Sequence, residues 1–340
     1  MSQNKVAIII LNWNGRNWLE KFLPSVTQHS PKALSNIYVA DNHSSDDSIS
    51  FLKHHYPQIQ ILQNKENAGY AGGYNFAIDL VEEPIICLLN SDIEVTENWL
   101  QPICETFERD PQIAAIQPKI LAYNNRDSFE YAGAGGGWID TLAYPFCRGR
   151  IFDTVEKDHG QYNDIAEIFW ASGACLFVRR DVYRTLGGLD ADFFAHQEEI
   201  DLCWRMKNAG YKIFYNGKST VYHVGGGSLP YGNQRKTYLN FRNNLFLMTK
   251  NLPVQELVWK LPLRLVLDGI AGVQTLLVNK NFSDVKAILQ AHGNFYLSFL
   301  KMWGKRLPNT NQVIGVYKRS IVFDYFILKK KVFEDLFKKN

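Results

Sequence analysis

The first 120 residues alternate short apolar runs with segments of helical periodicity, and this alternation restricts the fold more than any other feature. Short apolar runs predict buried strands, and apolar residues three and four apart predict helices. Strands and helices that alternate form a parallel sheet with right-handed crossovers. The predicted strands are 6–11, 37–40, 58–63 and 85–89, and the predicted helices are 18–26, 46–55 and 73–80. The sequence therefore predicts an α/β fold.

The fourth predicted strand, 85–89, stops abruptly at Asn90, Ser91 and Asp92. In an open α/β sheet, ligands bind at the carboxyl ends of the strands. A carboxylate there is suited to hold Mg²⁺ or Mn²⁺ and, through the ion, a diphosphate. Acidic residues also follow buried strands without any such role, so Asp92 gains weight only from other polar residues predicted at the same edge.

Three further segments place polar or small residues where strands end or helices begin. Asp41 follows the second predicted strand, where it could bind a base or ribose hydroxyls, or simply form a turn with Asn42. The segment NAGYAGGYN, 67–75, lets the backbone approach a ligand at a helix N-terminus, or only makes a tight turn. His223 ends a predicted strand before a glycine run and could be a metal ligand or a structural hydrogen-bonding group.

An acidic cluster opens a predicted helix over 198–209. Glu198, Glu199 and Asp201 lie in its first turn, where the helix dipole favours anions. Residues 198, 201 and 205 share one face, and Glu199 projects from another. This pattern allows one carboxylate to act as a general base while Asp201 and Arg205 brace the helix. A purely structural role for the cluster is the alternative.

In their order along the chain, VAIIILNWNG, DNHSSDDS, NAGYAGGYN, LLNSD, EEIDLCWR and HVGGGS resemble the motifs of inverting glycosyltransferases of the GT-A fold, family 2. The similarity covers about residues 5–230 and is greatest to the bacterial rhamnosyltransferase-like branch. It implies a Rossmann-like, mostly parallel sheet flanked by helices. It also implies a UDP- or dTDP-linked sugar donor, with rhamnose a candidate, a glycan or lipid-linked acceptor in cell-surface polysaccharide synthesis, and no nucleic-acid partner.

The resemblance implies roles for individual residues. Glu199 stands where the family has its general base, usually an Asp, with Glu198 as the substitute and Asp201 as the third catalytic-site carboxylate. Asp92 and His223 are the expected ligands of Mg²⁺ or Mn²⁺. The candidates for sugar-nucleotide binding are Asn12, Asp41, Asn67, Gly69, Gly72, Asn90 and Ser91, and those for acceptor binding are Trp170, Ser172 and Gly173.

Two features of these candidates leave questions open. LLNSD occupies the place of the family's D-x-D motif, but its first acid is Asn90. With one carboxylate fewer, we expect metal to bind detectably only together with the sugar nucleotide. Trp170 could stack on an acceptor sugar, and it could equally be a core residue.

The chain changes character near residue 231. Residues 231–340 carry 18 Lys and Arg against 6 Asp and Glu, a net of +12, which leaves 19 against 28, or −9, for 1–230. The sequence predicts a catalytic domain over 1–230 and a basic, mainly helical region over 231–340. The second region either packs on the catalytic part or lies on an anionic membrane surface. Because Pro262, Arg264 and Asp268 interrupt the apolar run 255–279, we expect no transmembrane helix there.

Residues 123–165, which follow the alternating N-terminal strands and helices, are rich in Gly, Tyr, Asp and Asn and include GAGGG at 133–137. This composition predicts a long irregular loop, which in a compact domain is usually functional. After it, residues 169–179 have the character of a strand or of buried core, and short strands are predicted over 212–215 and 219–222.

The cysteines and the N-terminus bear on localisation. Five scattered cysteines without a C-x-x-C pair predict reduced, buried thiols. MSQNKVAIII reaches Asn12 too soon for a signal peptide. We therefore expect a cytoplasmic protein, peripheral on the inner face of the membrane if the basic region binds lipid.

Two other functions remain open. One is a sugar-phosphate nucleotidyltransferase, although the turn NWNGRNW lacks the Gly-rich basic loop of that class. The other is a sugar-nucleotide-binding protein without turnover, which the substitution at Asn90 leaves open.

Overall fold

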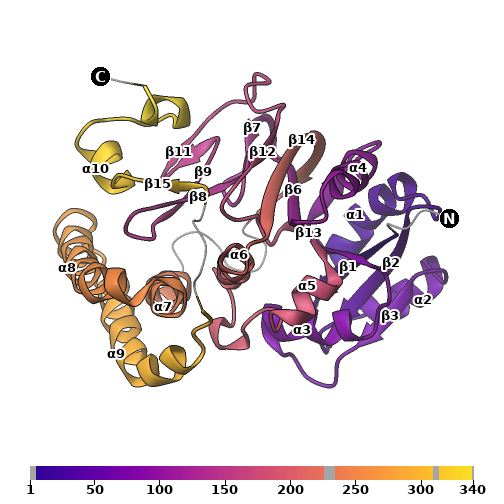
Figure 1. The fold of residues 1–340 in the computed structure, drawn as a ribbon. Helices are drawn as coiled ribbons and strands as arrows, with labels where there is room; N and C mark the ends of the chain where they lie inside the picture. Colours follow the sequence, from indigo (N-terminus) through magenta and orange to yellow (C-terminus); the bar gives the residue numbers. More distant parts are fainter. Residues whose placement is uncertain (1–4, 226–233, 309–313, 339–340) are drawn as a thin grey trace.

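The computed structural model describes residues 5–225, 234–308 and 314–338 (Figure 1). The strands are β1 (Val6–Asn12), β2 (Ser35–Asp41), β3 (Gln60–Gln63), β4 (Ile85–Asn90), β5 (Ile93–Val95), β6 (Ile113–Ala122), β7 (Asn125–Phe129), β8 (Gly137–Asp140), β9 (Pro145–Cys147), β10 (Arg150–Ile151), β11 (Thr154–Val155), β12 (Ile165–Glu167), β13 (Cys175–Arg179), β14 (Lys212–His223) and β15 (Val316–Tyr317). The α-helices are α1 (Arg16–His29), α2 (Ser48–His55), α3 (Gly69–Asp79), α4 (Gln101–Arg109), α5 (Arg180–Thr185), α6 (Glu198–Asn208), α7 (Gln234–Asn251), α8 (Val254–Asn279), α9 (Phe282–Gly304) and α10 (Ile321–Phe326), with 3₁₀ turns η1 (Ala191–Phe193) and η2 (Phe333–Leu336).

The main sheet runs in the order β12-β14-β6-β13-β4-β1-β2-β3, with β5 and β7 attached to β14 and β6. Neighbours β4, β1, β2 and β3 are parallel, as are β14 and β6, whereas β13 is antiparallel to both β4 and β6. The prediction of an α/β fold with a mostly parallel sheet is confirmed. The four predicted N-terminal strands are all present, within two residues of the expected ends.

Helices cover both faces of this sheet, because side chains alternate along the strands. Val6, Ile8 and Ile10 of β1 pack in the core under α1, α2 and α4. Ala7 and Ile9, which point the other way, pack in the core that contains α3, α5 and α6. Since β1 is buried on both faces, its carboxyl end is held rigidly where a ligand would bind.

The prediction of a long irregular loop over 123–165 is wrong, because this region forms short strands. β8, β9, β10 and β11 build a small sheet, and β15 from the C-terminal region adds to it in parallel beside β8. The strands are only two to four residues long, too short for a periodic pattern to reveal them. The predicted strands 212–215 and 219–222 are one strand, β14, with an irregularity between Asn216 and Thr220.

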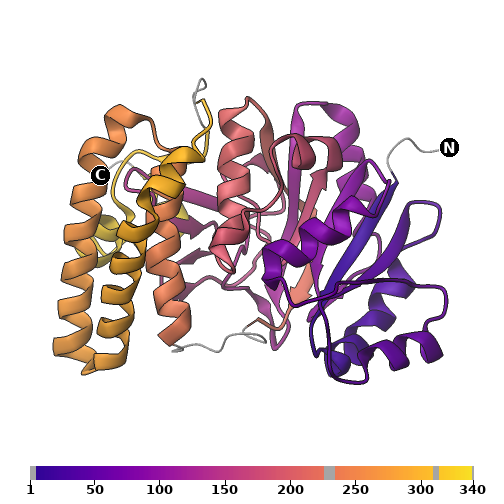
Figure 2. The ribbon, with the colours of Figure 1, turned by 90° about the horizontal axis from the view of Figure 1, so that it is seen from below.

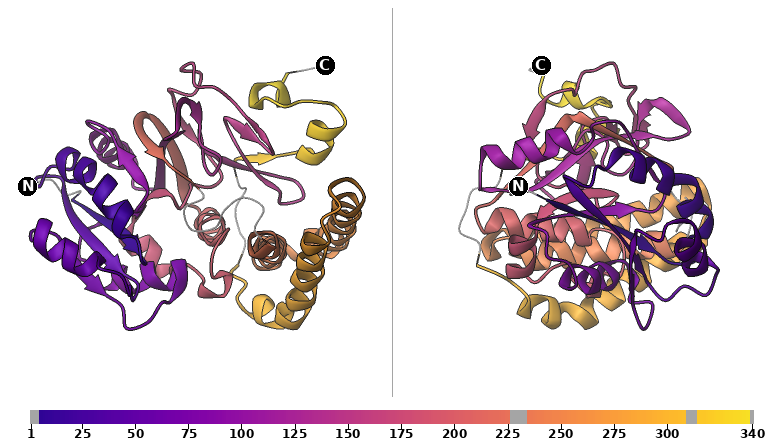
Figure 3. Two further views of the ribbon diagram at one scale, coloured as in Figure 1. Left: turned by 180° about the vertical axis from the view of Figure 1, so that it is seen from behind. Right: turned by 90° about the vertical axis from the view of Figure 1, so that its right-hand side faces the viewer.

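The C-terminal helices α7, α8 and α9 lie at the end of the molecule opposite to β3, and α8 runs antiparallel to both α7 and α9 (Figures 2 and 3). The predicted helical character is therefore confirmed, and the predicted boundary at 230 lies outside the described residues. The expectation that residues 255–279 do not cross a membrane stays a prediction. Helix α8 continues through Pro262 and, by length and composition alone, is one helix in the described part of the chain that could span a membrane.

Candidate active site

The carboxyl ends of β1 and β2 bring Asn12 and Asp41 side by side, because these two residues are paired in the parallel register. Asn12 Nδ2 donates to Asp41 Oδ1 over 3.2 Å and to Ser44 Oγ over 3.1 Å. The Oδ1 atom of Asn12 is buried and has no hydrogen-bond partner in the described residues. A buried acceptor without a partner is costly, so this atom is suited to receive an N–H or O–H group of a ligand.

The segment that opens α3 is fixed to this edge by Asn42, which sequence analysis considered only as a turn residue. Asn42 Nδ2 donates to Asn67 Oδ1 and to the Gly69 carbonyl oxygen, both over 2.9 Å. Gly69 has a φ of +69°, and a Cβ there would lie 3.3 Å from Phe194. At Gly72, a Cβ would come within 2.6 Å of the Cβ of Ala68, so this glycine is required by local packing.

The end of β4 faces the end of β14. His223 Nε2 lies 3.1 Å from Asp92 Oδ1 and 3.5 Å from Asn90 Nδ2, and His223 Nδ1 lies 3.4 Å from Glu130 Oε1. Burial alone would lower the pKa of His223, but the two carboxylates outweigh it and raise this pKa to about 10. Burial opposes ionisation of Asp92 as well, yet contact with His223 lowers the pKa of Asp92 overall. Ser91 lies beside the start of α1, with its Oγ 3.8 Å from the position of a Cβ on Gly15.

The donor set at this point fits a divalent cation only in part. No group of three or more His, Cys, Asp and Glu side chains is arranged to hold a metal within the described ranges. Asp92 and His223 alone present an oxygen and a nitrogen 3.1 Å apart. That distance is a hydrogen bond, so the two residues can hold one cation together only once His223 has lost the proton that its raised pKa favours. The remaining ligands would be diphosphate oxygens and water.

The two glutamates at the start of α6 follow a strained loop. Phe194, His196 and Gln197 have φ values of 65°, 69° and 70°. Non-glycine residues in this region are uncommon and cluster at functional sites. Burial raises the pKa of Glu199 to about 7, and burial together with the charge of Glu199 raises that of Glu198 well above its usual value. A carboxylate with a pKa near 7 is suited to accept a proton.

Glu199 lies beside Gly173, which was expected to line the acceptor side. A Cβ on Gly173 would be 3.6 Å from the Cβ of Glu199 and 2.5 Å from the hydroxyl oxygen of Tyr70. That hydroxyl donates to the Gly173 carbonyl oxygen over 2.6 Å. A side chain at Gly173 would therefore clash with the Tyr70 hydroxyl, so this glycine lets Tyr70 pack beside Glu199.

The other two expected acceptor residues are used by the fold. Trp170 is only 4% exposed, its ring packs against Gly137, and its Nε1 donates to the Trp138 carbonyl oxygen over 2.9 Å. It is a core residue in this structure and offers no face to a sugar. Ser172 Oγ donates to the Ala132 carbonyl oxygen over 2.6 Å and is likewise buried.

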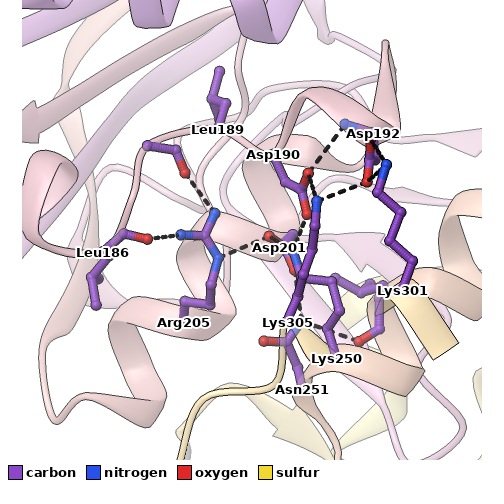
Figure 4. A network of polar contacts seen from close by, with 12 residues as sticks. Leu186, Leu189, Asp190, Asp192, Asp201, Arg205, Lys250, Asn251, Lys301 and Lys305 are labelled. Carbon is purple, nitrogen blue, oxygen red and sulfur yellow. Dashed lines mark hydrogen bonds and ion pairs between the residues drawn. The ribbon is translucent and has the colours of Figure 1, made fainter. Parts of the chain in front are cut away.

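Asp201 lies in a buried polar network with Arg205, Lys250 and Asn251 (Figure 4). Its carboxylate accepts hydrogen bonds of 2.8 Å each from Arg205, Lys250 and Asn251. Lys250 also binds Asp190, which Lys305 contacts in turn. Asp201 thus positions α6 against α7 and has no free oxygen directed to a substrate, so its inclusion among the catalytic residues is corrected to a positioning role.

Three side chains near the site were not found from the sequence: Glu130, His196 and Lys236. Glu130 reaches His223 because its backbone pairs with Ile120. The pKa of His196 is lowered to about 4, mainly by burial and to a smaller extent by the charge of Lys236. The Nε2 atom of His196 is buried and has no hydrogen-bond partner among the described residues. Lys236, in the first turn of α7, is half-buried and interacts electrostatically with Glu130. None of the three lies in a motif, so only long-range contacts identify them.

The α/β fold, with Asn12 and Asp41, the Asp92–His223 pair and the Glu198–Glu199 pair, agrees with the GT-A class of sugar-nucleotide-dependent transferases. Residues 7–187 match the family model described as "Glycosyl transferase family 2". The chain belongs to this inverting family, and it is a glycosyltransferase that takes its sugar from a nucleotide sugar. This membership sets aside the nucleotidyltransferase interpretation.

Known proteins agree with this assignment. The chain is 23% identical over 235 residues to an N-acetylglucosaminyl-diphospho-decaprenol L-rhamnosyltransferase of Mycobacterium tuberculosis, covering 64% of this chain and 75% of the relative. Its fold is similar to S. aureus TarS 1-349, with a TM-score of 0.56, 12% identity and coverage of 89% and 83%. It is also similar to the mannosyltransferase PcManGT of Pyrobaculum calidifontis in complex with GDP-Man and Mn²⁺, with a TM-score of 0.53, 13% identity and coverage of 90% and 89%.

Proposed function

We propose that this enzyme transfers a sugar, with inversion, from a UDP- or dTDP-linked donor to a hydroxyl group of a glycan or lipid-linked acceptor in cell-surface polysaccharide synthesis. Rhamnose is the first candidate sugar, and a polyprenyl-diphosphate-linked glycan is the first candidate acceptor, because the M. tuberculosis relative is named for both. Uracil and thymine present the same imide edge, to which the Asn12–Asp41 pair is complementary.

The observation that carries the proposal is the position and acidity of Glu199. Its pKa of about 7 allows it to be ionised at neutral pH and still accept a proton readily. Glu199 takes the proton of the acceptor hydroxyl while that oxygen attacks the anomeric carbon. The bond from the anomeric carbon to the diphosphate breaks, and its electron pair leaves with the nucleoside diphosphate. No covalent enzyme intermediate is required.

Asp92 and His223 would hold Mg²⁺ or Mn²⁺ at the diphosphate. The cation, when bound, neutralises charge on the departing diphosphate. Asn90 contributes an amide at the same edge, and the Gly69 backbone at the N-terminus of α3 favours a phosphate or the nucleotide close by.

The test is release of nucleoside diphosphate from UDP- and dTDP-sugars by the full chain, with Mn²⁺ and a polyprenyl-diphosphate-linked N-acetylglucosamine acceptor. We expect release to require both acceptor and Mn²⁺, and to be lost in Glu199→Gln while the donor still raises the melting temperature. Donor binding without any turnover would instead support the non-catalytic interpretation.

A further inference from the structure

Helix α8 buries its charged face and exposes its apolar face, which is the reverse of a helix on the surface of a soluble protein. Its charged residues Lys260, Arg264 and Asp268, four residues apart, are 7%, 4% and 1% exposed. The outward face is apolar, with exposures of 70% for Val258, 60% for Val266, 58% for Ile270, 56% for Val273 and 71% for Leu277. A surface helix normally buries its apolar stripe and exposes its charges.

Buried polar contacts fix this orientation. Arg264 Nε binds Asp268 Oδ1 over 2.8 Å, and the other carboxylate oxygen of Asp268 lies 3.3 Å from His292 Nε2 on α9. Arg264 also donates to Asn244 on α7 and stacks 3.6 Å over the ring of Tyr144. Turning α8 over would break these contacts and leave Asn244 in the interior without its partner, so the contacts hold the apolar face outward.

Helix α9 lies beside α8 (Figure 2) and carries exposed apolar residues of its own. Leu289, Tyr296, Leu297 and Leu300 are 68%, 60%, 87% and 81% exposed. Many exposed apolar side chains on two neighbouring long helices are typical of an interaction site.

The surrounding side chains identify a lipid bilayer as the occupant. Lys280, in the turn between the helices, and Lys286 and Lys301 on α9 are exposed, whereas Glu256, the one acidic residue of α8 with a largely exposed side chain in the described ranges, is paired with Lys260. Aromatic side chains stand near the helix ends: Trp259, Phe282 and Trp303 are 52%, 75% and 40% exposed. Apolar residues flanked by aromatic rings and lysines are typical of helices that lie in an anionic membrane interface.

We propose that the outer faces of α8 and α9 form a membrane-binding surface that inserts into one leaflet of an anionic bilayer. Although α8 is long and apolar enough to cross a membrane, its inward charges bind α7 and α9, so it lies along the leaflet with them. This surface is independent of the identity of the transferred sugar.

The membrane-binding surface is connected to the donor site at one end. Thr237 Oγ1 in the first turns of α7 donates to Asp284 at the start of α9 over 2.9 Å. Two residues earlier, Arg235 stacks 4.7 Å over Phe194, the side chain that backs Gly69. Binding at α8 and α9 would therefore hold the donor site close to the bilayer, where a lipid-linked acceptor is available.

Flotation of the full chain with vesicles tests the proposal. We expect the wild type to float with mixed phosphatidylglycerol and phosphatidylcholine vesicles, and less with phosphatidylcholine alone. The double variant V266E/I270E should bind vesicles about 100-fold more weakly, because each apolar side chain removed from the bilayer weakens binding by about tenfold or more. Leu80→Glu is the matched control, since Leu80 is 54% exposed but lies at the end of α3; it should float as the wild type does.

Several results would overturn the proposal. Wild-type protein that stays at the bottom of the gradient, or V266E/I270E protein that floats unchanged, contradicts membrane insertion. A wild-type dimer that does not float and that V266E/I270E converts to a monomer, measured by light scattering, would assign the surface to a second copy of the chain. The shift in melting temperature caused by UDP or dTDP should be the same in all variants, which separates a failure here from a failure of the proposed catalytic function.

Discussion

The side-chain amide of Asn243, on α7, donates to the carbonyl oxygen of His196 over 2.7 Å and to that of Ala195 over 2.9 Å. These carbonyls belong to the strained loop that leads into Glu198 and Glu199. Backbone in such conformations persists only where neighbouring groups fix it. The C-terminal region thus shapes the catalytic site from a distance, which its separate composition does not suggest.

We expect Asn243→Ala to lower kcat by about 100-fold, because small displacements of a catalytic group cost about that much. Donor binding should change little, since Asp41 and Asn67 lie on other elements. It is measured as the shift in melting temperature that the nucleotide causes. Thr249→Ala is the control: Thr249 is equally buried on α7, but its hydroxyl binds only the Leu245 carbonyl oxygen of the same helix. Equal loss of kcat in the two variants would argue against a specific role of the Asn243 amide.

Lys250 and Lys301 provide a matched pair for testing how the C-terminal helices are held. Lys250 is buried between Asp190 and Asp201, at 2.7 and 2.8 Å, whereas Lys301 is 62% exposed and binds Asp192 over 2.7 Å. Removing one partner of a buried ion pair costs about 3–5 kcal/mol, and an exposed pair contributes about 0–1 kcal/mol. Lys250→Met should therefore lower the free energy of unfolding in urea far more than Lys301→Met. Similar losses would contradict the buried network.

The same network predicts that a chain ending at 230 does not fold. Asp201 would lose Lys250 and Asn251 and keep only Arg205, and the small sheet would lose β15. Circular dichroism and solubility of the truncated chain would check this. A soluble, cooperatively unfolding fragment would show that residues 1–230 are an independent domain.

Much of the donor side of the site could be predicted from the sequence because it follows from local pattern. Apolar runs that end in Asn12, Asp41 and Asn90 give strands, and parallel register then places these ends at one edge. The acidic cluster at 198–201 was found because it opens a helix with clear periodicity.

The remainder depends on contacts between residues far apart in the chain. Glu130 reaches His223 through a hairpin of short strands, and His196 and Lys236 meet only after α7 folds back. Trp170 is an error of the opposite kind. Its residue type suits sugar binding, but packing against Gly137 buries it. The inward charges of α8 were mistaken for interruptions because their partners, Asn244 and His292, lie on other helices.

Asn90 gives a direct test of the metal site. With Asp92 as the main anionic ligand, we expect calorimetry to detect Mn²⁺ binding to the wild type only when UDP or a UDP-sugar is present. Asn90→Asp adds a carboxylate within reach of His223, whose Nε2 is 3.5 Å from the present amide, and should make Mn²⁺ binding measurable without nucleotide. Asn125→Asp, an exposed change on β7, should have no such effect. Tight Mn²⁺ binding to the wild type alone would contradict this assignment.

The pH dependence of catalysis tests Glu199 itself. Because burial raises its pKa to about 7, the base form is lost as the pH falls through that value, and kcat/KM should drop about tenfold per pH unit below it and level off above it. Glu199→Gln should lower kcat/KM by about 10²- to 10⁴-fold and remove this acidic limb, whereas Glu97→Gln, an exposed change, should alter neither. Glu199→Asp should keep part of the rate, since the family usually carries Asp at this position, with the midpoint of the limb shifted. A limb that persists unchanged in Glu199→Gln would transfer the role of the base to Glu198, whose pKa is also raised by burial.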